Sequence, residues 1–574
     1  MNMKKQRLVH LYTKEGESLT KTPWDVYPRP QLRRDSFISL CGEWKIKCGG
    51  GEWEKITVPF APETLLSGIC RSMGKNPYLE YERKFSVPKE FVNERVILHF
   101  GAVDSVASVS LNGKKLGEHI GGYLPFSFDI TDCLKDENVL NVTVSDENKG
   151  KCLPYGKQRH DRGGMWYTPI SGIWQSVWLE SVPEGYIKSL RIETGKDFAR
   201  VTAEGVSEGE IAVKTPSGEL IAPLAEGHVL IKLDNPQLWS PENPYLYEFT
   251  LCSGKDRVSS YFALRTLTVE TFNGIQRLCL NGKPCFFHAL LDQGYFSDGI
   301  YTPASPECYE KDILTAKNLG FNTLRKHIKI EPELFYYYCD KYGMIVFQDM
   351  VNNGGYSFIR DTALPTVLPA YRALPDKLLC RSKTVRAEFE RAMKETVNHL
   401  YNHPCICYWT VFNEGWGQFE SERMYRLIKS LDSTRFIDTA SGWFTGAESD
   451  VVSPHIYFKP VKIKPSKKPT LLSEFGGYSH KVAEHSFNLD KEYGYRFFKD
   501  REAFEDAFEK LYMEEIIPAV RNGLCGSVYT QLSDVEDETN GLITYDRRVI
   551  KVTKERMLNI SKALSEEMEA ACKE

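Results

Sequence analysis

From residue 271 onward, short apolar segments alternate with longer segments of helical periodicity, and this alternation limits the fold more than any other feature. It predicts βα units and a parallel sheet, because parallel strands are joined by helical crossovers. Eight candidate strands occur, at residues 286–291, 322–325, 344–348, 406–412, 436–440, 451–455, 470–474 and 526–531. Eight such units in about 300 residues is the count of a (β/α)8 barrel.

Helical segments fit between most of these strands, and only those after the fifth and sixth strands are poorly marked. The predicted helices are 306–319, 332–341, 384–400, 420–431, 501–520 and a last one after residue 553. An open doubly wound sheet is the structural alternative, but its phosphate-binding G-x-G-x-x-G does not follow any of the strands. The barrel is therefore favoured.

The first half of the chain has short alternating runs separated by turn residues and almost no helical periodicity. Residues 44–180 predict a β-sandwich or jelly roll, with a hairpin turn at Asn112-Gly113. Residues 181–269 suit a smaller immunoglobulin-like sandwich. We expect three domains, at residues 1–181, 182–270 and 271–574, as a length of 574 residues allows.

Charge and cysteine content exclude some partners. The 73 basic and 77 acidic residues give a net charge of -4 without a long block of like charge, which argues against nucleic acid. The 15 cysteines form no C-x-x-C pair, so we expect a reducing compartment. Without a signal-peptide-like start or a long apolar run, the chain is predicted to be cytoplasmic and not in a membrane.

Two glutamates stand where barrel strands end, the place where barrel active sites lie. Glu414 follows the run 405–412, and Glu474 follows the run 469–472. Either one alone is equally well explained as a strand-end residue that reaches solvent or pairs with Arg325. Together they match glycosidic hydrolysis, which needs one carboxylic acid to protonate the leaving oxygen and a second carboxylate across the bond.

The motifs around these residues resemble glycoside hydrolase family 2, which contains β-galactosidases, β-glucuronidases and β-mannosidases. The resemblance runs through residues 101–104, 111–113, 121–126, 171–175, 177–180, 280–284, 412–415 and 473–476. It implies a jelly-roll sugar-binding domain, an immunoglobulin-like domain and a catalytic (β/α)8 TIM barrel. It also implies a retaining mechanism.

By motif match, the resemblance implies that Glu414 is the general acid/base and Glu474 the nucleophile. Asn413 matches the residue that binds the sugar 2-hydroxyl. Arg325 resembles an arginine that keeps the nucleophile ionised, and Tyr457 resembles a tyrosine that contacts it. The other expected substrate-binding residues are His327, Asp292, Asp349, Trp443, His455 and Tyr529.

Each of these supporting residues also has a structural explanation. Arg325, His327, His455 and Tyr457 are, taken singly, common structural hydrogen-bonding types. Asp292 and Asp349 are equally explained as helix-capping residues. Trp443 is equally explained by packing at the barrel rim.

Departures from the family pattern bear on the sugar. Residues 538–540 lack the lysine of the N-x-K motif with which β-glucuronidases hold a carboxylate, and the acidic run 534–538 would repel one. We interpret that run as an exposed acidic loop. Tyr529 stands where the family commonly has tryptophan. No metal-ligand spacing occurs, so neither a metal nor another cofactor is expected.

These observations predict an exo-acting retaining β-glycosidase for neutral sugars, with β-galactosides favoured. The alternatives are β-mannosides, pentopyranosides and galactofuranosides, with β-glucuronides less favoured. A carbohydrate-binding protein without turnover is the non-enzyme alternative, and a homo-oligomer is possible. The polar loop 153–162 is a further hypothesis: it reaches over the barrel mouth and brings Lys157, Gln158 or Asp161 to the substrate.

Overall fold

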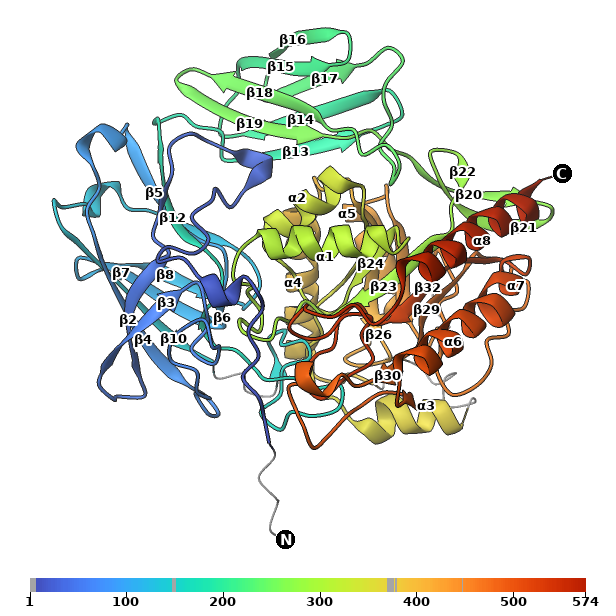
Figure 1. The fold of residues 1–574 in the computed structure, drawn as a ribbon. Helices are drawn as coiled ribbons and strands as arrows, with labels where there is room; N and C mark the ends of the chain where they lie inside the picture. Colours follow the sequence, from blue (N-terminus) through green and yellow to red (C-terminus); the bar gives the residue numbers. More distant parts are fainter. Residues whose placement is uncertain (1–6, 147–150, 369–375, 377–378, 446–447, 574) are drawn as a thin grey trace.

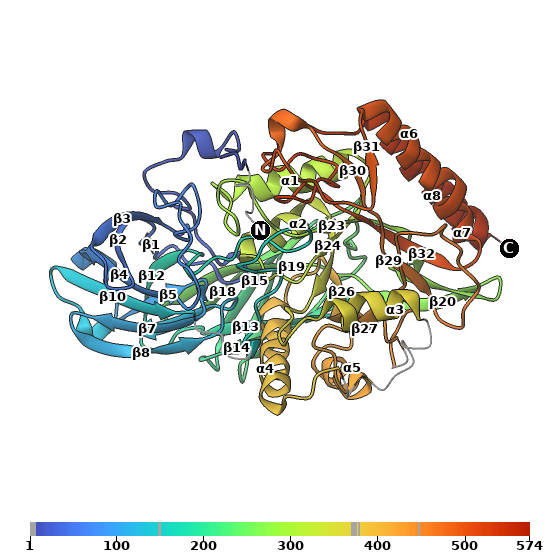
Figure 2. The ribbon, with the colours of Figure 1, turned by 90° about the horizontal axis from the view of Figure 1, so that it is seen from below.

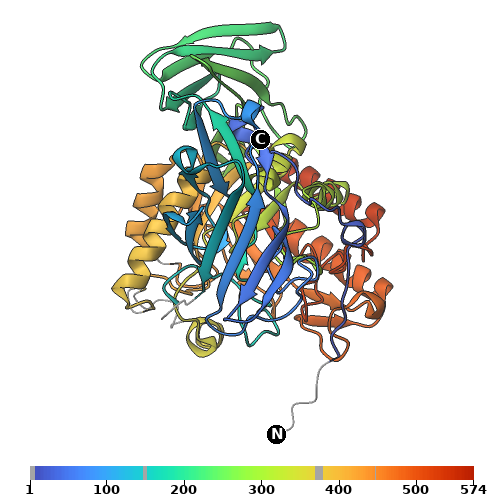
Figure 3. The ribbon, with the colours of Figure 1, turned by 90° about the vertical axis from the view of Figure 1, so that its left-hand side faces the viewer.

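The computed structural model describes residues 7–146, 151–368, 376, 379–445 and 448–573. Within them the chain forms two β-sandwiches and a barrel (Figure 1). The first sandwich lies beside the barrel, and the second caps both from above, as the side view also shows (Figure 3). This arrangement agrees with the fold predicted from the sequence.

The first sandwich packs two antiparallel sheets around a core that includes Trp44, Tyr81 and Val109. Asn112 and Gly113 have φ values of 54° and 81°, which is the left-handed turn expected of this hairpin. One sheet contains, in order, β1 (Ile38–Ser39), β12 (Val177–Val182), β5 (Arg95–Phe100) and β9 (Phe126–Asp129). The other contains β3 (Trp53–Val58), β2 (Gly42–Cys48), β4 (Tyr78–Phe85), β10 (Asn138–Ser145), β7 (Val106–Leu111) and β8 (Lys114–Ile120).

The second sandwich is smaller and is fastened to the barrel by buried polar contacts. Arg265 donates hydrogen bonds of 2.6 Å to the carbonyl oxygens of Pro404 and Ile406, and the hydroxyl of Tyr261 donates to Asp340. One sheet contains β13 (Ser189–Thr194), β14 (Phe198–Glu204) and β17 (His228–Lys232). The other contains β16 (Gly218–Leu224), β15 (Gly209–Thr215), β18 (Tyr247–Ser253) and β19 (Asp256–Phe262).

The barrel consists of eight neighbouring parallel strands, as the alternation of segments predicted. Where the first and last strands of this order meet, the amide of Gly442 donates to the carbonyl of Ser453 at 2.9 Å. The strand order is β27 (Phe436–Ser441), β26 (Ile406–Asn413), β25 (Ile345–Asp349), β24 (Thr323–Lys326), β23 (Phe287–Asp292), β32 (Leu524–Thr530), β29 (Thr470–Gly476) and β28 (His455–Ile456). A view from below places these strands inside the helices (Figure 2).

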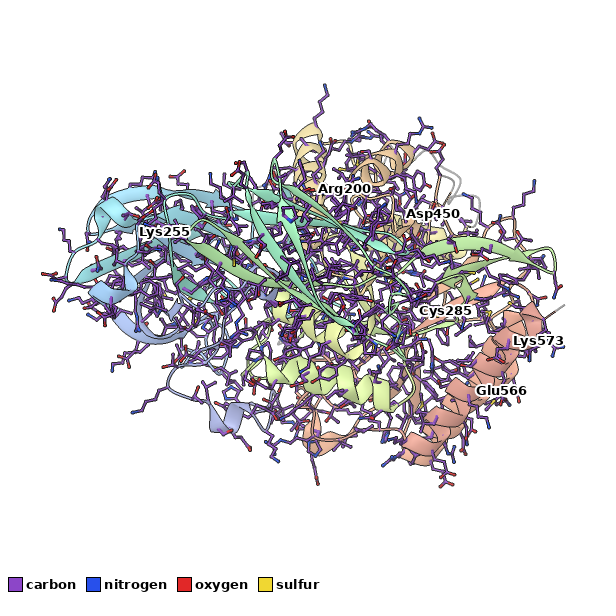
Figure 4. All side chains as sticks on the ribbon, turned by 90° about the horizontal axis from the view of Figure 1, so that it is seen from above. Arg200, Lys255, Cys285, Asp450, Glu566 and Lys573 are labelled. Carbon is purple, nitrogen blue, oxygen red and sulfur yellow. The ribbon has the colours of Figure 1, made fainter. Side chains whose placement is uncertain are left out.

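Among the described residues, the helices around the barrel agree with the predicted segments to within a few residues, except that the short helix α3 was not predicted and that α6 and α7 divide the predicted segment 501–520. They are α1 (Glu307–Asn318), α2 (Glu333–Tyr342), α3 (Leu364–Val367), α4 (Lys383–Leu400), α5 (Ser421–Leu431), α6 (Arg501–Leu511), α7 (Ile517–Val520) and α8 (Lys554–Cys572). Between the second sandwich and the barrel lies a small sheet of β20 (Leu267–Phe272), β21 (Ile275–Leu280) and β22 (Lys283–Pro284). Seen from above, Arg200 marks the second sandwich, and Glu566 and Lys573 mark α8 (Figure 4).

All of the 15 cysteines are free. In the described part of the chain, we find no helix with both the length and the hydrophobicity needed to cross a membrane.

Candidate active site

Glu414 and Glu474 converge at the carboxyl ends of the barrel strands. Glu414 directly follows β26 with a φ of 52°, and Glu474 lies within β29. One oxygen of each carboxylate and one nitrogen of His455 lie within 4.8 Å of one another. The side chain of Glu414 is 16% exposed, whereas that of Glu474 is 7% exposed. Glu414 is therefore the more exposed carboxylate of the pair, and Glu474 is the more buried one.

His455, on β28, lies between the two carboxylates. Its Nδ1 atom is 2.8 Å from Oε1 of Glu414 and 3.6 Å from Oε2 of Glu474. The other ring nitrogen is 2.9 Å from the hydroxyl of Ser441, which in turn donates to the hydroxyl of Ser473. These contacts fix the orientation of the imidazole, so one residue positions both glutamates.

Arg325, on β24, joins the ends of three other strands. Its guanidinium donates to Oε1 of Glu474 at 3.1 Å, to Oδ1 of Asn413 at 2.9 Å and to Oδ1 of Asp349 at 3.0 Å. Because Asn413 accepts through its carbonyl oxygen, its amide NH2 group remains a donor. A donor beside the acid/base candidate is what recognition of a sugar hydroxyl requires.

The environment of Glu474 favours its ionised form. Burial by itself raises the pKa of this carboxyl, but His455, Arg325 and His327 lower it by their charge. Tyr457 lowers it further by donating a hydrogen bond of 2.5 Å to Oε2. The net result is a pKa well below the ordinary value of glutamic acid, as a nucleophilic carboxylate requires.

The remaining predicted residues of this rim are paired with protein groups. Asp349 is 2.8 Å from Nδ1 of His327, and both side chains are buried. Asp292 accepts from Lys326 at 2.6 Å and from the amide of Gly294. The ring of Trp443 is 5.7 Å from that of His455 in an edge-on arrangement. A contact of these four predicted residues with sugar stays a prediction.

The structure corrects the placement of Tyr529. Its ring is fully buried and packs edge-on against Phe475 and Phe508, and its hydroxyl accepts from the amide of Tyr478. A fully enclosed ring leaves no surface for a sugar. The next residue, Thr530, is the one at the site, because its hydroxyl is 3.0 Å from that of Tyr457.

The acidic run 534–538 is buried and paired, so its interpretation as an exposed loop is wrong. Lys551 donates to Asp534 at 2.6 Å, and Arg162 reaches Asp537 at 3.2 Å and Glu536 at 3.4 Å. The pairing removes much of the negative charge that we expected an anionic sugar to meet.

The loop 153–162 contacts the segment that follows β25, whereas its reach over the barrel mouth to a substrate stays a prediction. The hydroxyl of Tyr155 donates to the carbonyl of Gly354 at 2.8 Å. Of the three residues proposed to meet substrate, Gln158 turns back into the first sandwich, where it donates to Asp104, and Asp161 is exposed. Lys157 remains, and its side chain is buried.

Within the described ranges, Glu414, His455 and Glu474 are the cluster whose spacing suits a metal ion. The same spacing serves a pair of carboxylates held by a histidine. That no metal is needed stays a prediction.

Comparisons with known proteins cover almost the whole chain. Residues 276–548 match the description "Glycosyl hydrolases family 2, TIM barrel domain". Residues 52–162 match "Glycosyl hydrolase 2 galactose-binding domain-like", and residues 184–265 match "Glycosyl hydrolases family 2".

Among curated relatives, a β-galactosidase of Thermoanaerobacter pseudethanolicus is 26% identical over 68% of this chain and 52% of its own length. A β-glucuronidase of Bacteroides fragilis is 24% identical over 63% of this chain and 54% of its own length. The chain thus spans about half the length of these relatives.

Solved structures share the fold. A β-glucuronidase of an uncultured Clostridium has a TM-score of 0.71 at 19% identity, covering 94% of this chain and 99% of its own. A family 2 β-galacturonidase of Eisenbergiella tayi has a TM-score of 0.66 at 20% identity, covering 94% of this chain and 98% of its own.

Proposed function

Because this chain belongs to glycoside hydrolase family 2, we propose that it hydrolyses terminal β-glycosides and retains the configuration at the anomeric carbon. The observation that carries the proposal is the approach of the two carboxylates, whose nearest oxygens lie within 4.8 Å. Retaining glycosidases place their carboxyl groups about 5–5.5 Å apart, whereas inverting enzymes leave about 6.5–9.5 Å for a water molecule. The spacing supports direct attack by one carboxylate.

In the first step, Glu474 attacks the anomeric carbon and forms a glycosyl ester, while Glu414 gives its proton to the leaving oxygen. In the second step, Glu414 takes a proton from water, and the water oxygen displaces Glu474 at the same carbon. Arg325 and Tyr457 suit Glu474 to its part, because both interactions favour its ionised form. The amide of Asn413 is available to the sugar 2-hydroxyl, where a bond that strengthens in the transition state speeds the reaction.

Two kinds of sugar have support. Relatives named β-galactosidase, at 26% and 28% identity, support the neutral β-galactoside predicted from the sequence. A β-hexuronide is the second candidate, because Arg162 and Lys551 pair with the acidic run that we expected to repel it. The loop 153–162 of the first sandwich contacts the segment that follows β25, which suits an enzyme that takes the terminal sugar of its substrate.

The experiment is hydrolysis of a panel of nitrophenyl β-glycosides by Glu474→Ala and Glu414→Ala, with Glu448→Ala as control. Glu448 is 47% exposed and pairs with Arg426, so this variant should behave as wild type. Each active-site variant should lose at least about 1000-fold in kcat. Azide should rescue Glu474→Ala and give an inverted glycosyl azide. Unchanged hydrolysis in either active-site variant would remove the assignment.

A further inference from the structure

The first sandwich contributes a segment that is seated on the barrel strands. The amides of Tyr155 and Gly156 both point to the carbonyl of Asn352, at 3.0 and 3.4 Å. Gly156 has a φ of 59°, and a side-chain carbon placed on it would lie 2.8 Å from the carbonyl oxygen of Ile328. Only glycine allows so close an approach. The next residue, Lys157, is therefore held against the segment that carries His327.

Lys157 is a buried cation that the protein does not neutralise at close range. Its side chain is 9% exposed, and its Nζ atom lies 5.7 Å from the ring centre of Trp166. Among the residues that the structure describes, no hydrogen bond or ion pair reaches this ammonium. The contact with the Trp166 ring partly offsets the cost of desolvating this charge, and an anionic ligand would offset it further.

The packing of Trp166 places the ammonium near the candidate active site, because its ring centre lies 5.2 Å from that of Trp416, two residues beyond Glu414. Burial lowers the pKa of His327, and among charged groups Lys157 lowers it further against the opposing effect of Asp349. His327 also acts on the nucleophile. Lys157 thus lies close enough to His327 to affect its pKa.

Glu538 does not serve as a close partner of Lys157. Its carboxyl accepts hydrogen bonds from the hydroxyl of Tyr167 and from Asn540. Burial raises its pKa, so the uncharged form is favoured relative to an exposed glutamic acid, although Lys157 acts in the other direction. In the described part of the chain, each of its oxygens accepts one of these bonds and neither is in hydrogen-bond contact with the ammonium.

We propose that Lys157, supplied by the first sandwich, is a specificity-determining residue that binds the carboxylate of an acidic sugar, a β-hexuronide, in the catalytic barrel. The inference rests on the proposed function and narrows its substrate class. An anion suits this position better than a hydroxyl, because a charge-assisted hydrogen bond offsets the desolvation of both groups. The cation comes from a different domain than the N-x-K lysine that we looked for in the sequence.

The test compares pairs of nitrophenyl sugars that differ only at C6: β-glucuronide against β-glucoside, and β-galacturonide against β-galactoside. Wild-type enzyme should have the higher kcat/KM on the acid of at least one pair. Lys157→Met should lower kcat/KM on that acid by about 10- to 100-fold and change the neutral partner by less than about threefold. Lys157→Arg should keep part of the preference for the acid.

Thermal unfolding separates recognition from a structural role. Removal of an unpaired buried charge should leave the Tm of Lys157→Met equal to or above that of wild type, whereas loss of a structural partner would lower it. Lys151→Met is the matched control, since Lys151 lies just before the same loop with its ammonium over the ring of Tyr155, and it should keep the acid preference.

Two results overturn the inference: equal losses on the acid and neutral sugars, or a wild-type enzyme that hydrolyses only neutral sugars. Either would leave the proposed retaining mechanism intact. Hydrolysis of none of the β-glycosides would instead count against the proposed function.

Discussion

Tyr457 shows how single side chains suit the two glutamates to different tasks. Its hydroxyl donates a hydrogen bond to Glu474 and its ring stacks on Tyr495 at 3.8 Å, so the ring is held in place with its hydroxyl directed at Glu474. Glu414 instead has its closest contact with His455 and is more exposed. The differing surroundings of the two carboxyls match an ionised nucleophile and a proton-exchanging acid/base.

Tyr457→Phe removes the hydrogen bond and keeps the ring. Because that bond lowers the pKa of Glu474, the pKa should rise and the acid limb of kcat/KM should move to higher pH. We expect kcat to fall by about 10- to 100-fold. The measurement is a pH profile of wild type, Tyr457→Phe and the neighbouring control Tyr495→Phe. An acid limb that stays in place in Tyr457→Phe would contradict this account of the nucleophile.

At the residue level, the sequence predicted the carboxylate pair better than its surroundings. A glutamate that ends a buried run is visible from local pattern, and Glu414 and Glu474 did prove to be neighbours. Which of two adjacent residues faces the barrel mouth is set by strand register, so Tyr529 was chosen where Thr530 lies at the site. The position of Thr530 near the end of the predicted strand 526–531 was the signal that could have identified it as a site residue.

Arg325 connects elements that are far apart in the chain. From β24 its guanidinium reaches Asp349 on β25, Asn413 on β26, and Glu474 with the carbonyl of Ser473 on β29. Four strand ends are thereby held by one buried cation. Its loss would leave two buried carboxylates, Asp349 and Glu474, without a counter-charge that they share, which is far more costly than loss of an exposed pair.

Arg325→Met should therefore destabilise the protein as well as inactivate it. We expect the free energy of unfolding to fall by about 3–5 kcal/mol, since one partner of a buried ion pair is removed. Arg426→Met removes a 67% exposed arginine from its pair with Glu448 and should cost about 0–1 kcal/mol. Chemical denaturation monitored by fluorescence compares the two variants. A similarly small fall in the free energy of unfolding of both variants would show that Arg325 does not stabilise the strand ends in this way.

Element prediction succeeded where the sequence repeats a clear local pattern. All eight barrel strands overlap predicted segments, although β28, at His455–Ile456, shares only His455 with the predicted segment 451–455. The interpretation of the acidic run 534–538 as an exposed loop was wrong for a different reason. The run's partner Arg162 is far away in the sequence, and no motif identifies Lys551 as its other partner. Composition therefore could not predict that the run is buried and neutralised.

At the scale of the whole molecule, the first sandwich packs against the segment that follows Glu414. Trp166 packs edge-on against Trp416 at 5.2 Å and Tyr356 at 4.9 Å. Trp416 lies two residues beyond Glu414, and Glu414 in turn acts electrostatically on Tyr356. The sequence predicted a loop at the barrel mouth but not which side chains would pack there, because that depends on how the domains dock.

Trp166→Ala should lower kcat/KM by at least about tenfold, although this residue lies outside the barrel. The cavity left by the missing indole ring would loosen the segment that carries Glu414. Trp53→Ala is the control within the same sandwich, since Trp53 is 42% exposed, and it should keep full activity. Kinetics at a temperature where both variants are folded by circular dichroism provides the comparison. Equal activity of the two variants would mean that the sandwich only packs against the barrel.

The most direct measurement of the central claim is capture of the covalent intermediate. A 2-deoxy-2-fluoro β-glycoside with a good leaving group, matched to the best sugar of the panel, slows the second step and should accumulate a glycosyl ester. Peptide mass spectrometry should find the label on Glu474, and Glu474→Ala should remain unlabelled. Hydrolysis of the parent substrate with first release of the α-anomer, and with no label on Glu474, would contradict the retaining mechanism proposed here.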